Sequence, residues 1–192
     1  IPIMKKTLVL CYLVMASVVL RAEVVNVAGN GTPNSNRPLW GPGNWSIQKM
    51  IDGDAQGVFH LDTAPDPGAA YDLDLGRDFA IQEIRILPRQ DGCCPERLKQ
   101  IRVSIHKDTG QGALGTEVWG TDLFTDGTNA GAKAGGVVNI KPPTVQTGRW
   151  IQIKSLEDPV QNYALQMDEV EVYADVPAGE ENRAVKTLAA SN

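Results

Sequence analysis

The residues best suited to chemistry are gathered in one short stretch, residues 89–97, with the sequence Arg-Gln-Asp-Gly-Cys-Cys-Pro-Glu-Arg. The guanidinium groups of Arg89 and Arg97 can donate hydrogen bonds to the ring and hydroxyl oxygens of a sugar. The adjacent Cys93 and Cys94 can form an apolar patch beside them. Two prolines and a glycine in and before this stretch make it too interrupted for a core strand. The sequence therefore predicts a rigid polar loop whose donors suit a carbohydrate.

A purely structural role of the same loop is the alternative. Arg89 and Arg97 could form ion pairs with Asp91 and Glu96. In that case the ion pairs stabilise the loop, and the loop binds no ligand.

The two adjacent cysteines have three possible states. Cys11 lies in an N-terminal segment that we expect to be removed, which leaves Cys93 and Cys94 in a compartment that permits disulfides. They can be free thiols, an intermolecular bridge or a vicinal disulfide. We favour the vicinal disulfide, which would be a flat and rigid apolar patch at the tip of the loop.

The first 22 residues are typical of a secretory signal peptide. Met4-Lys5-Lys6 is a positively charged start, and residues 8–20 form an apolar run of 13 residues. This run is well short of the roughly 20 residues that a membrane-spanning helix needs. We therefore expect residues 1–22 to be cleaved, the protein to be secreted or held at the cell surface, and no membrane insertion after cleavage; an uncleaved anchor is the alternative.

The remaining chain is acidic. Loss of Lys5, Lys6 and Arg21 would leave 15 basic residues against 23 acidic ones, a net charge of −8. Binding to nucleic acid or to an anionic membrane needs a basic face, so we expect neither partner.

Short segments of alternating apolar residues predict a β-sandwich or jelly roll. Apolar residues fall at every second position, as in Ile84/Ile86 and Ile151/Ile153, and no stretch repeats at helical period. An edge strand and a long loop are expected within residues 23–46. We expect strands at residues 70–75, 81–87, 101–106, 117–124, 136–140, 149–154 and 168–173.

Residues 23–175 are thus predicted to be a single domain. Residues 176–192 have the composition of a linker, Val-Pro-Ala-Gly-Glu-Glu, followed by the start of a further module of the same polypeptide or a frayed tail.

Asp52-Gly53-Asp54 is a candidate site for a hard cation such as calcium, which takes its oxygen ligands from carboxylates and a bent backbone. The spacing alone also fits an ordinary solvated turn.

Several motifs occur together in this chain: residues 51–54, the segment Tyr-Asp-Leu-Asp-Leu-Gly at 71–76, the loop at 89–97, and Met-Asp-Glu-Val-Glu-Val-Tyr at 167–173. As a set they resemble the discoidin and galactose-binding-like superfamily of jelly rolls, over roughly residues 24–175. The resemblance implies a galactose-binding-like jelly-roll β-sandwich.

Within that superfamily the loop most resembles the F-type, fucose-binding lectins. The resemblance implies a ligand-binding set of His60, Arg89, Asp91, Cys93, Cys94 and Arg97. The chain departs from the family pattern in two places: Gly92 is an extra residue before the cysteines, and 28 residues separate His60 from Arg89. Both departures lie where the sugar would sit, which puts fucose specificity in doubt.

The same resemblance implies a structural calcium site. Its ligands would be Asp52, Asp54, the carbonyl of Lys49, Thr63 and Glu169. Because Val170 and Val172 are expected to face the core, Glu169 is expected to face outward and to reach the cation.

The sequence therefore predicts a non-catalytic carbohydrate-binding, lectin-like domain with glycans as partners. The alternative is a generic discoidin-like module that binds carbohydrate or protein in adhesion, appended to a larger surface protein or enzyme. Asp72 and Asp74 share one face of a strand, as the two carboxylates of a glycosidase would, but no cleft signature or other catalytic motif accompanies them.

Overall fold

The computed structural model describes residues 22–39, 46–54, 68–90, 97–128, 136–156 and 165–180, together with the backbone of residues 59–60. Within these ranges the chain forms strands and two short 3₁₀ turns, and no helix is long and apolar enough to cross a membrane. The elements are β1 (Ala22–Asn26), η1 (Ala28–Asn30), β2 (Thr32–Ser35), η2 (Ile47–Met50), β3 (Phe59–His60), β4 (Ala70–Leu87), β5 (Ile101–Asp108), β6 (Leu114–Leu123), β7 (Val138–Ile140), β8 (Gln146–Ser155), β9 (Gln166–Met167) and β10 (Glu169–Pro177).

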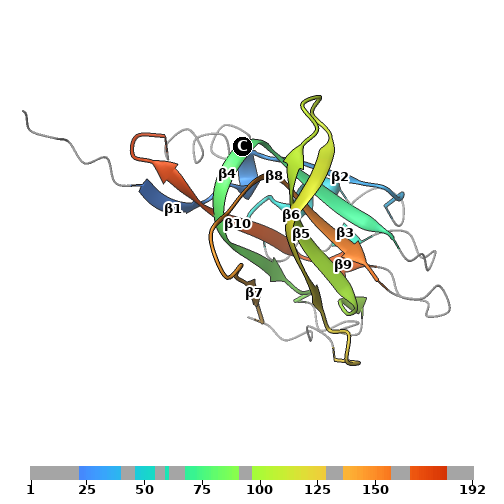
Figure 1. The fold of residues 1–192 in the computed structure, drawn as a ribbon. Helices are drawn as coiled ribbons and strands as arrows, with labels where there is room; N and C mark the ends of the chain where they lie inside the picture. Colours follow the sequence, from blue (N-terminus) through green and yellow to red (C-terminus); the bar gives the residue numbers. More distant parts are fainter. Residues whose placement is uncertain are drawn as a thin grey trace, which may run out of the picture.

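The long strand β4 belongs to both layers of a sandwich (Figure 1). Residues 70–74 pair with β8 and β2, and β5 and β6 continue that layer beyond β8. Residues 79–87 pair with β10 and β7, and β1 lies outside β10. All of these pairs are antiparallel. The predicted all-β jelly-roll fold is confirmed.

The alternating apolar residues form the core between the layers. Ile84 and Ile86 of β4 are fully buried, as are Ile151 and Ile153 of β8. Val172 of β10 lies opposite Ile84 in the register. The period-two pattern therefore identified the inward face of each of these strands correctly.

The prediction of two separate strands at 70–75 and 81–87 is wrong, because β4 runs through both. The register of β4 against β8 shifts between Asp74 and Phe79, so the intervening residues form an irregularity within a strand that pairs with β8 on both sides of it. Gly76 has a φ of +81° there, and its N–H donates to Asp74 Oδ1 at 2.8 Å. A sequence of Gly, Arg and Asp predicts a break, whereas the fold uses it as a bend.

The outer face of β5 is covered at His106. Because His106 falls opposite the apolar face of Val103 and Ile105, its sequence position predicts a solvated side chain, and this prediction is wrong. Only 7% of His106 is exposed. Its Nδ1 donates to the carbonyl of Gly115 at 3.1 Å, and its Nε2 lies 2.8 Å from Ser104 Oγ. Both ring nitrogens have partners, so His106 stabilises the β5–β6 hairpin.

Gly148→Ala is expected to lower the free energy of unfolding by about 2–3 kcal/mol. A Cβ at position 148 would overlap Ile105 Cγ2 and lie 2.9 Å from the carbonyl oxygen of His106, at the closest approach of β8 to β5. Urea denaturation measures the loss. Thr147→Ala, an exposed neighbour on the same strand, is the control and should change stability by less than about 1 kcal/mol.

Candidate functional site

Two arginines from separate segments converge on one buried side chain. Arg89 follows the end of β4, Arg97 precedes β5, and Gln166 lies in β9. Arg89 Nη1 donates to Gln166 Oε1 at 3.0 Å, and Arg97 Nη1 lies 3.4 Å from the same oxygen. The side chain of Gln166 is fully buried. The two guanidinium groups therefore occupy neighbouring positions and do not point apart.

The base of the arginine-bearing loop is fixed by Asp168, which is also fully buried. Its Oδ2 accepts a hydrogen bond from the Gln90 N–H at 2.8 Å, and its own N–H donates to the carbonyl of Leu87 at 2.9 Å. The loop thus leaves β4 in a set direction. A fixed backbone favours binding because less conformational entropy is lost when a ligand arrives.

The register of the small sheet brings the backbone of His60 to the same place. β3 pairs with β9 so that His60 lies opposite Gln166. Three of the six expected ligand-binding residues therefore meet around Gln166: Arg89 and Arg97 through their side chains and His60 through its backbone. Asp91, Cys93 and Cys94 lie outside the described residues, as does the side chain of His60.

A second cluster joins the Asp52-Gly53-Asp54 turn to the start of β10. The Gly53 N–H lies 3.3 Å from each carboxylate oxygen of Glu169, and the Asp54 N–H donates to Asp52 Oδ1 at 2.9 Å. Lys49 lies just before this turn, in η2, and Thr63 lies outside the described residues. The turn and the glutamate, which are 116 positions apart in the chain, are therefore neighbours.

Glu169, which is expected to face away from the core, is nonetheless covered, since only 3% of its surface is exposed. The turn that follows η2 covers it and contacts it through Gly53. Burial raises the pKa of Glu169 to about 8, and the carboxylates of Asp52, Glu171 and Asp54 raise it as well, against the hydrogen bond from Gly53, which lowers it.

Comparison with known families identifies the fold that carries these clusters. A family model described as "F5/8 type C domain" matches residues 31–169. The chain belongs to this family. No curated protein matches the sequence.

Solved structures with the fold of this F5/8 type C domain include carbohydrate-binding modules. The lectin domain of lectinolysin, complexed with Lewis B antigen, is 17% identical with a TM-score of 0.62, over 79% of this chain and 98% of that chain. A fucose binding module of Streptococcus pneumoniae, SpX-3, is 18% identical with a TM-score of 0.60, over 78% and 98%. The family 32 carbohydrate-binding module of NanJ from C. perfringens, in complex with galactose, is 16% identical with a TM-score of 0.59, over 79% and 99%. At these sequence identities the similarity shows a shared fold alone.

The carboxylates at the second cluster of the F5/8 type C domain fit a hard cation. Glu169 is a buried acid beside three further acids, an arrangement that is costly when ionised unless a positive charge is near. Within the described ranges, no three His, Cys, Asp or Glu side chains by themselves form a metal-binding group. A cation here would therefore need backbone carbonyls as well, as calcium commonly does.

The two strand carboxylates that could have indicated a glycosidase are already occupied. Arg149 donates to Asp74 through Nε at 2.6 Å and Nη2 at 2.8 Å, and Gln152 Nε2 donates to Asp72 Oδ1 at 2.8 Å. The hydrogen bonds from Arg149 hold the pKa of Asp74 below its usual value. A carboxylate that is harder to protonate is poorly suited to act as a general acid, so this face of the F5/8 type C domain does not resemble a glycosidase centre.

Sequence reasoning found the arginines but missed Gln166 and Asp168. Gln166 belongs to no motif, and Asp168 belongs to the motif at 167–173 without an assigned role; both become significant only through contacts with residues more than 65 positions away. The one available signal was their place directly before the last strand, beside Glu169.

Proposed function

We propose that this F5/8 type C domain is a secreted lectin-like module that binds a glycan at the loop between Arg89 and Arg97. The convergence of both guanidinium groups on Gln166 Oε1 carries the proposal. Each arginine has five N–H donors in a rigid fork, a geometry that suits paired hydrogen bonds to neighbouring oxygens. The Nε of Arg97 is buried and has no hydrogen-bond partner among the described residues.

The remaining residues of the site have complementary roles in this proposal. His60 and Asp91 add a donor and an acceptor for sugar hydroxyls, and a Cys93–Cys94 disulfide offers an apolar face to C–H or methyl groups. The acid-rich chain, with its net charge of −5, suits a neutral saccharide better than an anionic one.

Fucose is the sugar that we propose first. The lectinolysin domain bound to Lewis B antigen and the fucose binding module SpX-3 share the fold over more than three quarters of this chain. The galactose complex of the NanJ module supports galactose-type glycans as the second candidate, since the extra Gly92 changes the loop that would contact the sugar.

Calcium is the cofactor that we propose for the cluster at Asp52, Asp54 and Glu169, with the carbonyl of Lys49 and Thr63 as further ligands. Its role would be structural, because it would hold the 46–54 segment against β10. Bound calcium supplies the positive charge that the buried carboxylate needs in order to ionise.

A glycan array with the protein, run with calcium and again with a chelator, tests the function. Binding to fucosylated glycans supports the fucose lectin, and binding to other glycans alone supports the broader carbohydrate-binding module. Absence of binding to any glycan in both conditions contradicts the carbohydrate function and leaves protein adhesion as the role of the domain. Monosaccharide binding is expected to be weak for each site, so the array should present the protein in multivalent form.

A further inference from the structure

A pocket of about 480 Å³ lies at the bend of β4, near the end of β10. Its volume is in the range of small-molecule binding sites. In Figure 1 the ends of β1 and β10 lie on one side of the molecule, whereas β3 and β9 lie on the other. Phe79 lines the pocket, and Leu87, at the end of β4 just before Arg89, is eight residues further along the same strand. At about 3.3 Å per residue, the pocket is more than about 20 Å from the arginine site.

The pocket has an apolar floor. Leu75 and Val176 are almost completely buried, and the half-buried ring of Phe79 lies beside them. These three side chains belong to or pack against the main core, so their positions are fixed. The part of this floor that a ligand can reach is the Phe79 ring, and an aromatic ring held in place in this way can support the C–H face of a sugar without reorganising.

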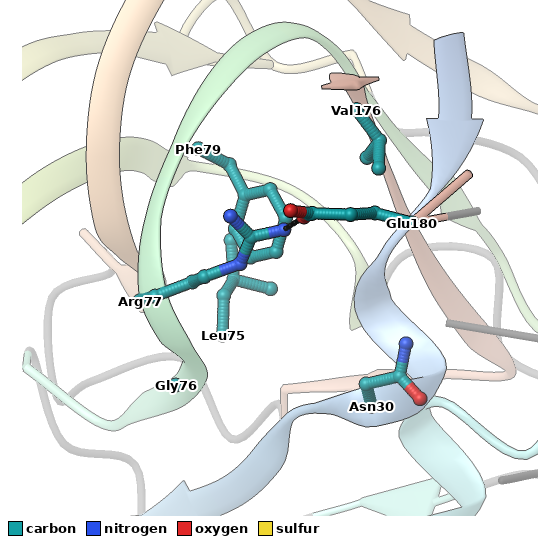
Figure 2. Close-up of a pocket in the computed structure, with 7 residues that line it drawn as sticks. All are labelled: Asn30, Leu75, Gly76, Arg77, Phe79, Val176 and Glu180. Atoms are coloured by element: carbon teal, nitrogen blue, oxygen red, sulfur yellow. Dashed lines mark hydrogen bonds and ion pairs between the residues drawn. The ribbon is translucent and has the colours of Figure 1, made fainter. Parts of the chain in front are cut away.

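Charged groups lie across this floor, as Figure 2 shows. Arg77 reaches from the bend of β4 and Glu180 from the turn after β10, and they meet through Nη2 and Oε2 at 2.8 Å. The guanidinium group lies 4.4 Å from the centre of the Phe79 ring. The turn that carries Glu180 is closed by a hydrogen bond from its N–H to the carbonyl of Pro177 at 3.0 Å.

A ligand can form hydrogen bonds with both members of the ion pair at a small cost in free energy. The side chains of Arg77 and Glu180 are 54% and 46% exposed, and ion pairs of such exposure contribute roughly 0–1 kcal/mol. An anionic ligand would be repelled by the carboxylate of Glu180, and a cationic ligand would be repelled by the guanidinium group of Arg77. A neutral polyol instead accepts a hydrogen bond from Arg77 and donates one to Glu180 through neighbouring hydroxyls. The amide of Asn30 adds a group that can both donate and accept at the pocket edge.

We propose that this pocket is a second saccharide-binding site. A neutral sugar ring lies with its C–H face on the exposed part of the Phe79 ring, which the buried Leu75 and Val176 support from below, and its hydroxyls bridge Arg77 and Glu180. The inference rests on this pocket and does not require the arginine site at Arg89 to bind a sugar. Two sites more than about 20 Å apart on one domain would make a single copy bivalent toward a branched or crowded glycan surface.

Protein-observed NMR titration of the ¹⁵N-labelled protein tests the proposal. The probes are the methyl glycosides of fucose, galactose and N-acetylgalactosamine, each added to about 20 mM so that millimolar affinities are covered. We expect saturable shifts of the Gly76 amide and the Arg77 Nε–H with at least one probe. Arg77→Ala should weaken this binding at least tenfold, and Arg89→Ala should leave it unchanged.

The matched control is Lys107→Ala, which removes an ion pair of similar exposure with Asp78, beside the pocket residues but not among them. This variant should bind the probe as the unaltered protein does.

Shifts confined to the neighbourhood of Arg89 and Gln166 would overturn the second site and leave the proposed function intact. Pocket shifts that survive Arg77→Ala, or that glycine and acetate produce equally well, would overturn the assignment to a sugar. A protein that binds glycans on the array but shows no pocket shifts with any probe would also overturn it.

Discussion

Arg89→Ala is expected to lower the affinity for the glycan recognised on the array at least a hundredfold while leaving the fold intact. A charge-assisted hydrogen bond contributes about 1.5–3 kcal/mol, so loss of one or two such bonds corresponds to a factor of about one hundred. Arg89 lies in the loop beyond β4 and is not part of the buried core. Isothermal titration calorimetry measures the affinity, and the melting temperature should fall by no more than a few degrees.

Two further variants separate ligand contact from general damage. Arg102→Ala removes an arginine of β5 whose guanidinium group is bound to Glu117 and Asp122 of β6, so the glycan affinity of this variant should be unchanged. Gln166→Met removes the shared acceptor but no sugar donor, and we expect roughly five- to twentyfold weaker binding because the guanidinium groups lose their common anchor. Normal binding by Arg89→Ala would contradict the proposed site.

The fold could be predicted from the sequence because its signal is local. Alternation at Ile84/Ile86 and Ile151/Ile153 reports which face of a strand is apolar, and the core uses those faces. The continuity of β4 could not be predicted in this way. Gly76 breaks the apolar pattern, and whether a break is a turn or a bend depends on the strands that pair on either side.

The sequence also could not predict which segments cover the outward faces of the strands. Alternation correctly places Glu169 and His106 away from the core, but it does not say what packs on that side. The turn at Gly53 covers Glu169, and the strand that includes Gly115 covers His106. Both contacts depend on the path of distant segments, which composition and spacing do not specify.

The candidate sugar site was partly predictable for the same reason. The chemistry of Arg89 and Arg97 is evident from their types and their place in one loop. Their meeting point is not, because Gln166 is supplied by β9, whose position is set by pairing with β3. Sequence indicates which groups a site can use, whereas the long-range pairing decides which of them face one another.

Removal of calcium is expected to lower the melting temperature by about 5–11 °C at pH 8. If the dissociation constant for calcium is about a hundredfold below the calcium concentration supplied, binding raises the free energy of unfolding by about 2.7 kcal/mol. Each kcal/mol corresponds to a change of roughly 2–4 °C in the melting temperature for a chain of this size. Differential scanning calorimetry with calcium and with a chelator measures the shift, and elemental analysis of the purified protein reports the metal. An unchanged melting curve together with a metal-free protein would contradict the calcium site.

The pH dependence of the chelated protein gives the same site a second signature. The pKa of Glu169 is raised from 4.5 to about 8 in the folded state. In the unfolded chain this carboxyl ionises first, so the free energy of unfolding without calcium should fall as the pH rises from about 4.5 to about 8 and then level off. One pKa unit corresponds to about 1.4 kcal/mol, so the rise from 4.5 to about 8 sets an upper limit of about 5 kcal/mol on this decrease. Calcium, which binds the ionised form, should stabilise the protein more at pH 8 than at pH 5.5.

Glu169→Gln is expected to be more stable than the unaltered protein in chelator and less stable than it with calcium. The neutral amide removes the cost of a buried charge, so in chelator at pH 8 this variant should melt above the unaltered protein. With calcium present it should melt below it, because the amide binds the cation more weakly than a carboxylate does. A simple packing defect would lower the melting temperature in both conditions. The crossover therefore distinguishes a cation site from a glutamate that only fills space beneath the Gly53 turn, and a variant that is less stable in both buffers would argue for the latter.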